Sequence, residues 1–183
     1  MKRRLTDRKF QFVLDLGSGP VPKNEFAGQT VTGVDIRSYG QSGNVLRCNL
    51  VSEKLPFKDE SFDCITAYDL LEHIPRVVDK GGASEFPFIN LMNEVWRCLK
   101  QEGIFYSSTP CYPFPEAYQD PTHVNICTED TLNNYFCERA WARIYGFHGT
   151  FRLIEEGWNG PHFYCVMQKA AVEVNANRNF VQR

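Results

Sequence analysis

Short runs of apolar and β-branched residues recur along the chain, and each has the length of a buried β-strand. The runs lie at residues 10–16, 30–35, 44–47, 62–67 and 104–109, with two more at 150–155 and 162–169. Runs of this length, bounded by glycine, proline or polar residues, predict strands rather than helices. The last two runs are separated by Gly157, Asn159, Gly160 and Pro161, which predicts an antiparallel hairpin.

The segment between the fourth and fifth runs has the period of an amphipathic helix. Its apolar residues are Ile89, Met92, Val95, Trp96 and Leu99. This spacing places them on one face of a helix that packs against a sheet. Lys100 and Gly103 are typical of a helix end, and a second helix is predicted from Thr128, whose side chain can cap it. Strands that alternate with helices or loops predict an α/β fold with a mostly parallel sheet.

Length and charge fit one soluble domain spanning residues 1–183. The chain shows no internal repeat and no low-complexity linker, and domains of this size are common. Residues 1–9 form a basic lead-in, which is either a solvated start or a patch for an acidic substrate. Residues 172–183 are polar and predict a flexible tail. The formal net charge of -2 makes a nucleic-acid substrate an unfavoured expectation.

The seven cysteines are scattered and include no Cys-x-x-Cys pair. This pattern predicts neither a disulfide framework nor a zinc ribbon, and it favours a reducing, cytoplasmic location. Cys111, His123, Cys127 and Cys137 match no common structural zinc spacing, so we expect no metal site. No apolar stretch of about 18 residues is present, so no membrane span is expected.

A glycine-rich turn follows the first predicted strand. Gly17 and Gly19 allow backbone to approach a ligand closely, and Asp35, at the end of the second strand, can accept hydrogen bonds from both hydroxyls of a ribose. Dinucleotide-binding sheets use the same devices. However, Pro22 stands where their fingerprint needs glycine, and Asp15 suits a cationic ligand end better than a pyrophosphate. The pattern therefore favours a ligand with a ribose and an amine, and it disfavours a nicotinamide oxidoreductase.

Five segments in order carry a resemblance to a known family. They read VLDLGSG, TGVD, CNLVSEKLPFKDESFD, AYDLLEHIP and NEVWRCLKQEGIF. Together they resemble the class I S-adenosylmethionine-dependent methyltransferases, and most of all the type 11 methyltransferases, over roughly residues 10–109. The resemblance implies S-adenosylmethionine as cofactor. It also implies a Rossmann-like, mostly parallel seven-stranded sheet with a C-terminal antiparallel hairpin and helices on both faces. The stretches after the first and second strands are too short for full helices, so the helices of the N-terminal half are expected to be shortened.

The resemblance further implies a set of cofactor contacts at the carboxyl ends of the strands. These are Asp15, Gly17 and Gly19 for the methionine end, Asp35 for the ribose, Ile36, Asn49 and Leu50 for the adenine, and Tyr68 and Asp69 near the methionine or the sulfonium. Two features depart from the family. Val21 replaces the third glycine, and the usual N-terminal helix over the cofactor is missing. Another part of the chain, a partner subunit or a homo-oligomer could complete that lid.

A long loop at residues 110–127 follows the fifth strand and is expected to meet the substrate. Its candidate acceptor contacts are Tyr112, Tyr118, Asp120 and Asn125. His123 is the first candidate for the base that takes the acceptor's proton, and His73 is the second. Each histidine has an alternative structural interpretation, His123 as a residue that fixes the loop and His73 as part of an ordinary helical turn.

Two functions remain open from the sequence. The first is S-adenosylmethionine-dependent methyl transfer to a small-molecule or sugar acceptor, at an oxygen atom. The second is a catalytically weak S-adenosylmethionine-binding module that acts as a subunit partner. Cofactor binding with and without turnover distinguishes the two.

Overall fold

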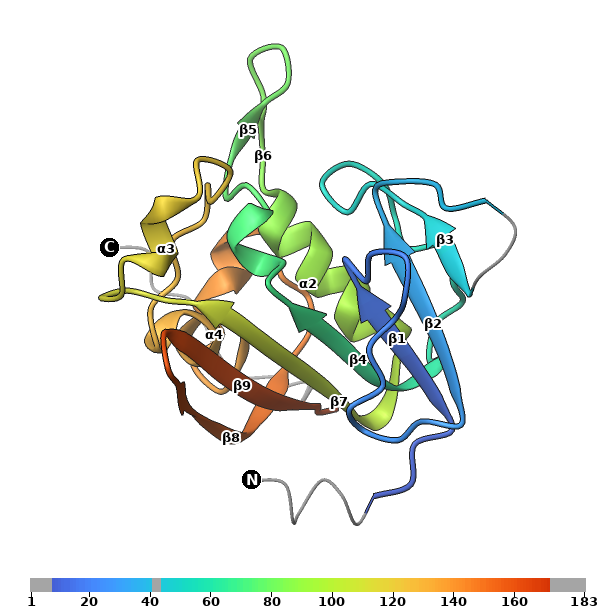
Figure 1. The fold of residues 1–183 in the computed structure, drawn as a ribbon. Helices are drawn as coiled ribbons and strands as arrows, with labels where there is room; N and C mark the ends of the chain where they lie inside the picture. The colour runs from blue at the N-terminus through green and yellow to red at the C-terminus, as the bar shows by residue number, and fades with distance from the viewer. Residues whose placement is uncertain (1–7, 41–43, 172–183) are drawn as a thin grey trace.

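The computed structural model describes residues 8–40 and 44–171, which form a seven-stranded sheet with helices packed on it (Figure 1). The predicted tail at 172–183 and most of the predicted lead-in, residues 1–7, lie outside the described residues. The strands are β1 Phe12–Leu16, β2 Thr30–Asp35, β3 Val45–Arg47, β4 Phe62–Tyr68, β5 Val78–Asp79, β6 Ser84–Glu85, β7 Leu99–Pro110, β8 Phe151–Asn159 and β9 His162–Lys169. The helices are α2 Pro87–Cys98, α3 Glu116–Gln119 and α4 Asp130–Phe136, with 3-10 turns η1 Leu71–His73 and η2 Trp141–Tyr145.

The order of the main sheet is β3-β2-β1-β4-β7-β9-β8. In this sheet, strands β3, β2, β1, β4 and β7 pair in parallel, whereas β9 runs antiparallel to β7 and β8 runs antiparallel to β9. The predicted fold class and its C-terminal hairpin are therefore confirmed. The strand order changes direction beside β1 and β4, and open α/β sheets bind ligands at the carboxyl ends of the strands at such a point.

Three local features differ from the sequence-based expectation. The short hairpin of β5 and β6 was not predicted, because each strand has only two residues. Helix α2 ends at Cys98, and Leu99 already pairs with Phe62, so Gly103 lies inside β7 and does not end the helix. Thr128 does not cap α4; its hydroxyl lies 3.2 Å from Thr131 Oγ1 and its backbone N–H also donates to that oxygen.

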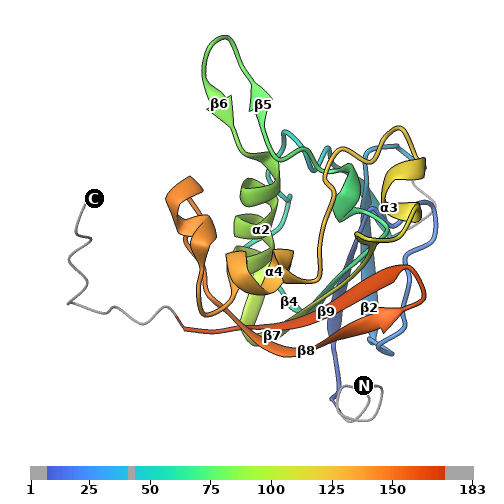
Figure 2. The ribbon, with the colours of Figure 1, turned by 90° about the vertical axis from the view of Figure 1, so that its left-hand side faces the viewer.

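The helices cover one face of the sheet (Figure 2). Leu14 and Phe105 point to this face from β1 and β7, and they share one buried cluster with Met92 of α2 and Phe136 of α4. Burying such side chains is worth about 1.5–3 kcal/mol each. We call this cluster the helix-side core. It fixes the orientation of the strands whose ends form the site.

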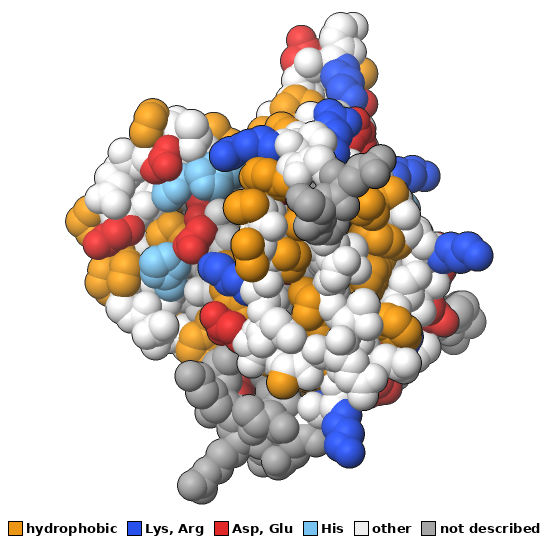
Figure 3. All heavy atoms as spheres, turned by 45° about the vertical axis from the view of Figure 1, so that its right-hand side comes forward, with side chains coloured by type: hydrophobic (Ala, Val, Ile, Leu, Met, Phe, Trp, Pro, Cys, Tyr) orange, Lys and Arg blue, Asp and Glu red, His pale blue; other side chains and the backbone are white. Residues whose placement is uncertain are grey.

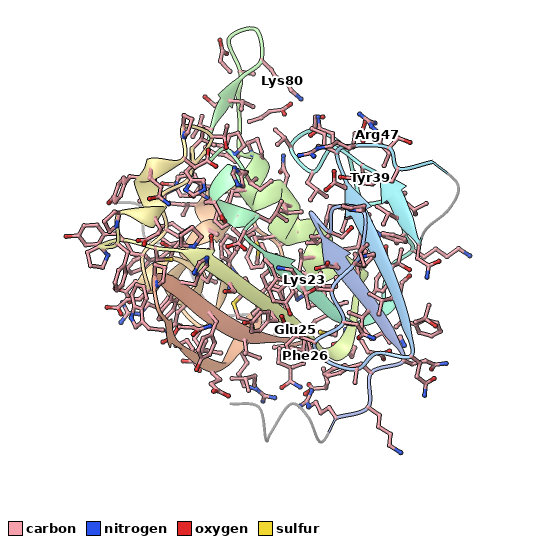
Figure 4. The ribbon with its side chains drawn as sticks, viewed as in Figure 1. Lys23, Glu25, Phe26, Tyr39, Arg47 and Lys80 are labelled. Atoms are coloured by element: carbon pink, nitrogen blue, oxygen red, sulfur yellow. The ribbon has the colours of Figure 1, made fainter. Side chains whose placement is uncertain are left out.

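The opposite face carries a smaller cluster that contains no helical residue among the described parts of the chain. Its buried members are Phe10, Val13, Cys64, Ile104, Tyr106 and Val166. We call it the open-face cluster. The segment between β1 and β2 crosses it and carries Phe26 (labelled in Figure 4). The Phe26 ring packs edge-on against Tyr106, with ring centroids 5.2 Å apart. Within residues 8–40 and 44–171, helices cover one face only, and Pro20 and Pro22 disfavour a helix in the short link that crosses the other face.

None of the helices within the described residues is long and apolar enough to cross a membrane.

Candidate functional site

The turn after β1 is held against the end of β2 by backbone hydrogen bonds. Gly17 and Gly19 have φ angles of +65° and +62°, which only glycine adopts without strain. The Ser18 N–H donates to the Val34 carbonyl at 3.1 Å, and the Gly19 N–H donates to Asp35 Oδ2 at 3.0 Å. The turn and the carboxylate therefore form one preorganised unit at the carboxyl edge of the sheet.

Asp35 is the centre of this unit. Its Oδ1 accepts hydrogen bonds from the Arg37 N–H at 2.9 Å and from the Tyr39 hydroxyl at 3.3 Å. A carboxylate offers about four acceptor positions, so one remains on Oδ2 for a ribose hydroxyl and a second hydroxyl can compete with Tyr39. Ile36 next to it is 58% exposed and offers an apolar surface on which a flat ring can lie. Figure 4 labels Tyr39 beside this end of β2.

Asp15 holds the turn from inside the protein. It is 1% exposed, and its carboxylate accepts hydrogen bonds from the Lys23 N–H at 2.8 Å and from Thr66 Oγ1 at 2.7 Å. Burial raises the pKa of Asp15, while the hydrogen bonds from Lys23 and Thr66 oppose that rise. Both carboxylate oxygens of Asp15 already accept hydrogen bonds from the protein, so its direct contact with the methionine end of the cofactor stays a prediction.

Asn49 and Leu50, which with Ile36 are expected to contact the adenine, differ in exposure. Asn49 is partly exposed, and its Oδ1 accepts the Val51 N–H at 3.1 Å, which closes a tight turn after β3. Leu50 is buried in the helix-side core. Asn49 is therefore the more accessible of the two to a ligand.

Tyr68 and Asp69 leave β4 toward different places. The Tyr68 ring lies against the open-face cluster, with Lys23 Nζ 4.3 Å from its centroid, so its side chain leaves on the face opposite to the helices. Asp69 is exposed, has a φ of +48°, and lies 2.8 Å through Oδ1 from His162 Nε2. Sequence reasoning missed this partner of His162, because the two residues are far apart in the chain.

The predicted acceptor loop has exposed aromatics and a buried anchor. Tyr112 and Tyr118 are 55% and 52% exposed, and Asp120 accepts the Thr122 N–H at 2.8 Å, as a turn residue does. Asn125 is fully buried; its Nδ2 donates to the Leu71 carbonyl at 2.9 Å, and its Oδ1 accepts from Arg76 Nε at 2.6 Å. The amide of Asn125 therefore fastens the loop to η1, and this structural role replaces its predicted role as an acceptor contact.

That anchoring brings the two candidate bases together. The rings of His73 and His123 meet edge to face, with centroids 4.8 Å apart. Glu72 is buried beside them, and its backbone carbonyl accepts the N–H groups of Val124 and Asn125 at 2.9 Å each. Histidine and acidic side chains gather on one part of the surface in Figure 3. Sequence reasoning missed Glu72, although its position next to His73 is a signal that could have found it.

A separate cavity of about 550 Å³ lies between α2, α4 and η2. Aromatic side chains line it, among them Phe86, Tyr135 and Trp141, and none of the expected cofactor contacts does so. Tyr112 lines another hollow, of about 510 Å³, together with Phe114 and Trp158. The expected acceptor loop thus borders a space of ligand size.

The two glycines of the turn give a matched test of its geometry. A Cβ on Gly17 would lie 2.9 Å from Leu70 Cδ1, whereas a Cβ on Gly19 would meet nothing within 4 Å. Both alanine variants place a side chain in the left-handed region, which costs about 1–2 kcal/mol. We expect Gly17→Ala to lower the free energy of unfolding more than Gly19→Ala in urea titrations. Equal losses would contradict the close packing of the turn on Leu70.

Comparison with known proteins supports the same interpretation of this edge. A family model described as "Methyltransferase domain" matches residues 14–107, just over half of the chain. No curated protein matches the sequence.

Solved structures share the fold. A methyltransferase from Methanosarcina mazei, described as dependent on S-adenosylmethionine, is 20% identical, with a TM-score of 0.58, over 88% of this chain and 93% of its own. The 1,6-didemethyltoxoflavin-N1-methyltransferase of Burkholderia thailandensis, solved with S-adenosylhomocysteine, is 16% identical over 92% and 78%, with a TM-score of 0.57. A putative methyltransferase from Haloferax volcanii, in complex with the Trm112 methyltransferase activator, is 13% identical over 92% and 88%, with a TM-score of 0.58.

The cofactor fits the residues found at this edge. Gly19 leaves open space for backbone contact, the carboxylate of Asp35 keeps an acceptor position for a ribose hydroxyl, and the exposed Ile36 offers a surface for a flat ring. The matched family, the fold and this edge together identify the chain as a member of the methyltransferase-domain family, whose cofactor is S-adenosylmethionine.

Proposed function

We propose that the protein transfers a methyl group from S-adenosylmethionine to an oxygen atom of a small-molecule or sugar acceptor. When bound, S-adenosylmethionine supplies a methyl group attached to a positively charged sulfur. The observation that carries the choice of acceptor atom is the pairing of His73 and His123 on the loop side of the β4 end. A hydroxyl acceptor must lose a proton during transfer, and histidine is the side chain best suited to take it near neutral pH.

His123 is the better placed of the two bases. Its Nδ1 lies 3.3 Å from the Ala117 carbonyl, which can only accept, so Nδ1 carries the hydrogen and Nε2 has a free lone pair. Asp120 Oδ2 lies 3.9 Å from that Nε2 and would stabilise the ring once it is protonated. Tyr112 and Tyr118 on the same loop would exclude water from the acceptor.

His123→Gln tests the assignment of the base. A lost general base lowers kcat by about 10²–10⁴-fold, so we expect methyl transfer from labelled S-adenosylmethionine to fall by at least about 100-fold. The assay uses a panel of sugars and hydroxylated small molecules, and binding of S-adenosylhomocysteine is expected to stay unchanged. His148→Gln, at an exposed histidine outside the site, is the control. Transfer to an amine in preference to every hydroxyl in the panel would contradict the choice of oxygen.

The open-face cluster favours a second candidate. Its lack of helical cover among the described residues is consistent with a catalytically weak cofactor-binding module that needs a partner subunit, or a second copy, to complete it. The Haloferax volcanii neighbour was solved in complex with an activator, which supports the same idea weakly. S-adenosylhomocysteine binding without turnover on any acceptor of the panel would favour this candidate over the first.

We also propose a cytoplasmic location. All seven cysteines are free and buried, which suits a reducing compartment. Oxidised pairs in protein purified directly from cells would contradict this proposal.

A further inference from the structure

Glu72, His73 and His123 form a compact group of potential metal ligands. Each offers one ligand atom, and these atoms all lie within 4.8 Å of one another. Two ligand atoms around a tetrahedral ion lie about 3.4 Å apart, given metal–ligand bonds of 2.0–2.2 Å. Small side-chain rotations would therefore close this group around an ion. We call it the Glu72–His73–His123 cluster.

Both histidines are held in the tautomer that a metal needs. His73 Nδ1 lies 3.2 Å from the Thr122 carbonyl, and His123 Nδ1 lies 3.3 Å from the Ala117 carbonyl. The Thr122 hydroxyl donates its hydrogen to Asp120 Oδ1 at 2.6 Å, so it too can only accept from His73. Both Nε2 atoms therefore keep a lone pair. Metal-binding histidines are oriented in the same way, by a backbone carbonyl or carboxylate behind the ring.

Glu72 supplies the independent observation. Its side chain is 1% exposed, and its Oε2 accepts a hydrogen bond from Thr109 Oγ1. Its Oε1 is buried without a hydrogen-bond partner among the described residues. A buried carboxylate oxygen with no partner is costly, and a cation between it and the two imidazoles would satisfy it.

We propose that Glu72, His73 and His123 bind a divalent first-row transition-metal ion, with coordination positions open toward the acceptor. Two imidazoles and a carboxylate suit ions such as Zn²⁺, Fe²⁺ or Mn²⁺, which departs from the sequence-based expectation of no metal. Asp120 Oδ2 lies 3.9 Å from His123 Nε2 and is a further potential ligand.

The ion would activate the acceptor hydroxyl, a role that rests on the proposed methyl transfer. It would bind the acceptor hydroxyl and lower its pKa, so that the proton passes to bulk water. An imidazole that binds an ion through Nε2 cannot take a proton there, and the ion then replaces His123 as the group that activates the acceptor.

Titration of the metal-free, full-length protein with Co²⁺ tests the binding site. We expect one ion per chain, with weak visible absorption bands from nitrogen and oxygen ligands and no intense near-ultraviolet thiolate band. Glu72→Gln, His73→Gln and His123→Gln are each expected to weaken Co²⁺ binding by at least about tenfold. Thr122→Val removes a hydroxyl that contacts both His73 and Asp120 and should also weaken Co²⁺ binding, whereas the exposed His148→Gln should leave it unchanged.

The same samples separate this inference from the proposed function. Native protein that binds S-adenosylhomocysteine but takes up no Co²⁺ would overturn the metal site and leave the methyltransferase proposal standing. Thiolate bands, or binding unaffected by all three ligand variants, would also overturn it. If a ligand variant does not fold, thermal unfolding of the native protein with added Zn²⁺ tests the site instead. The metal site predicts a rise of Tm that saturates at one equivalent of Zn²⁺, and no rise would overturn it.

Discussion

Asp35→Ala should weaken the binding of S-adenosylhomocysteine by about 100-fold or more. A hydrogen bond to a charged group contributes about 1.5–3 kcal/mol, and a ribose offers two hydroxyls to this carboxylate. The same change removes the acceptor of the Gly19 N–H, so the turn after β1 loses its tie to β2. Calorimetric titration of both proteins measures the difference directly.

Two further variants make this result specific. Asp35→Asn keeps an acceptor oxygen without the charge and should lie between the native protein and the alanine variant. Asp59→Ala removes a carboxylate whose side chain is 77% exposed and which pairs with Arg97 at the surface, so affinity should not change. An Asp35→Ala protein that binds as tightly as the native protein, with its Tm preserved, would contradict the ribose assignment.

Phe136→Ala should lower the free energy of unfolding by about 3–5 kcal/mol, the usual cost of removing a buried phenylalanine. Phe136 of α4 is fully buried, and its ring meets Phe88 of α2 and Phe147 edge to face, with centroids 5.4 and 5.1 Å away. It therefore joins the two main helices of the helix-side core. A domain of ordinary stability has only about 5–15 kcal/mol in total, so urea titration should reveal a marginal protein.

The neighbouring residue provides the control for this core variant. Tyr135 precedes Phe136 on α4 and is 36% exposed. Its ring meets Trp141 edge to face, with ring centroids 5.8 Å apart. Tyr135→Ala should cost much less, because its ring already meets water. Equal losses at the two positions would mean that α4 does not pack on the sheet as described.

Much of the fold was predictable because buried strands are short apolar runs. The runs at 62–67 and 162–169 differ from β4 and β9 by one residue or none. The boundary between α2 and β7 was not predictable in the same way. Leu99 fits the apolar stripe of the helix, yet its pairing with Phe62, far away in the sequence, decides its conformation.

The site was predictable where its residues follow strands in order. Asp35 and the two glycines could be located because β1 and β2 are adjacent and parallel, so their carboxyl ends meet. Sequence reasoning could not assign the role of Asn125 or place Glu72 beside His123, because both depend on how a long loop folds back onto η1. Periodicity places a side chain on a strand or helix, but it does not give the path of such a loop.

Calorimetric titration of the unmodified protein with S-adenosylhomocysteine, beside NAD, tests the central claim most directly. The arrangement of Gly17, Gly19 and Asp35 predicts saturable binding of S-adenosylhomocysteine at one site per chain and no response to NAD. Saturable binding of NAD with none of S-adenosylhomocysteine would contradict the assignment of this edge of the sheet to the methyl donor.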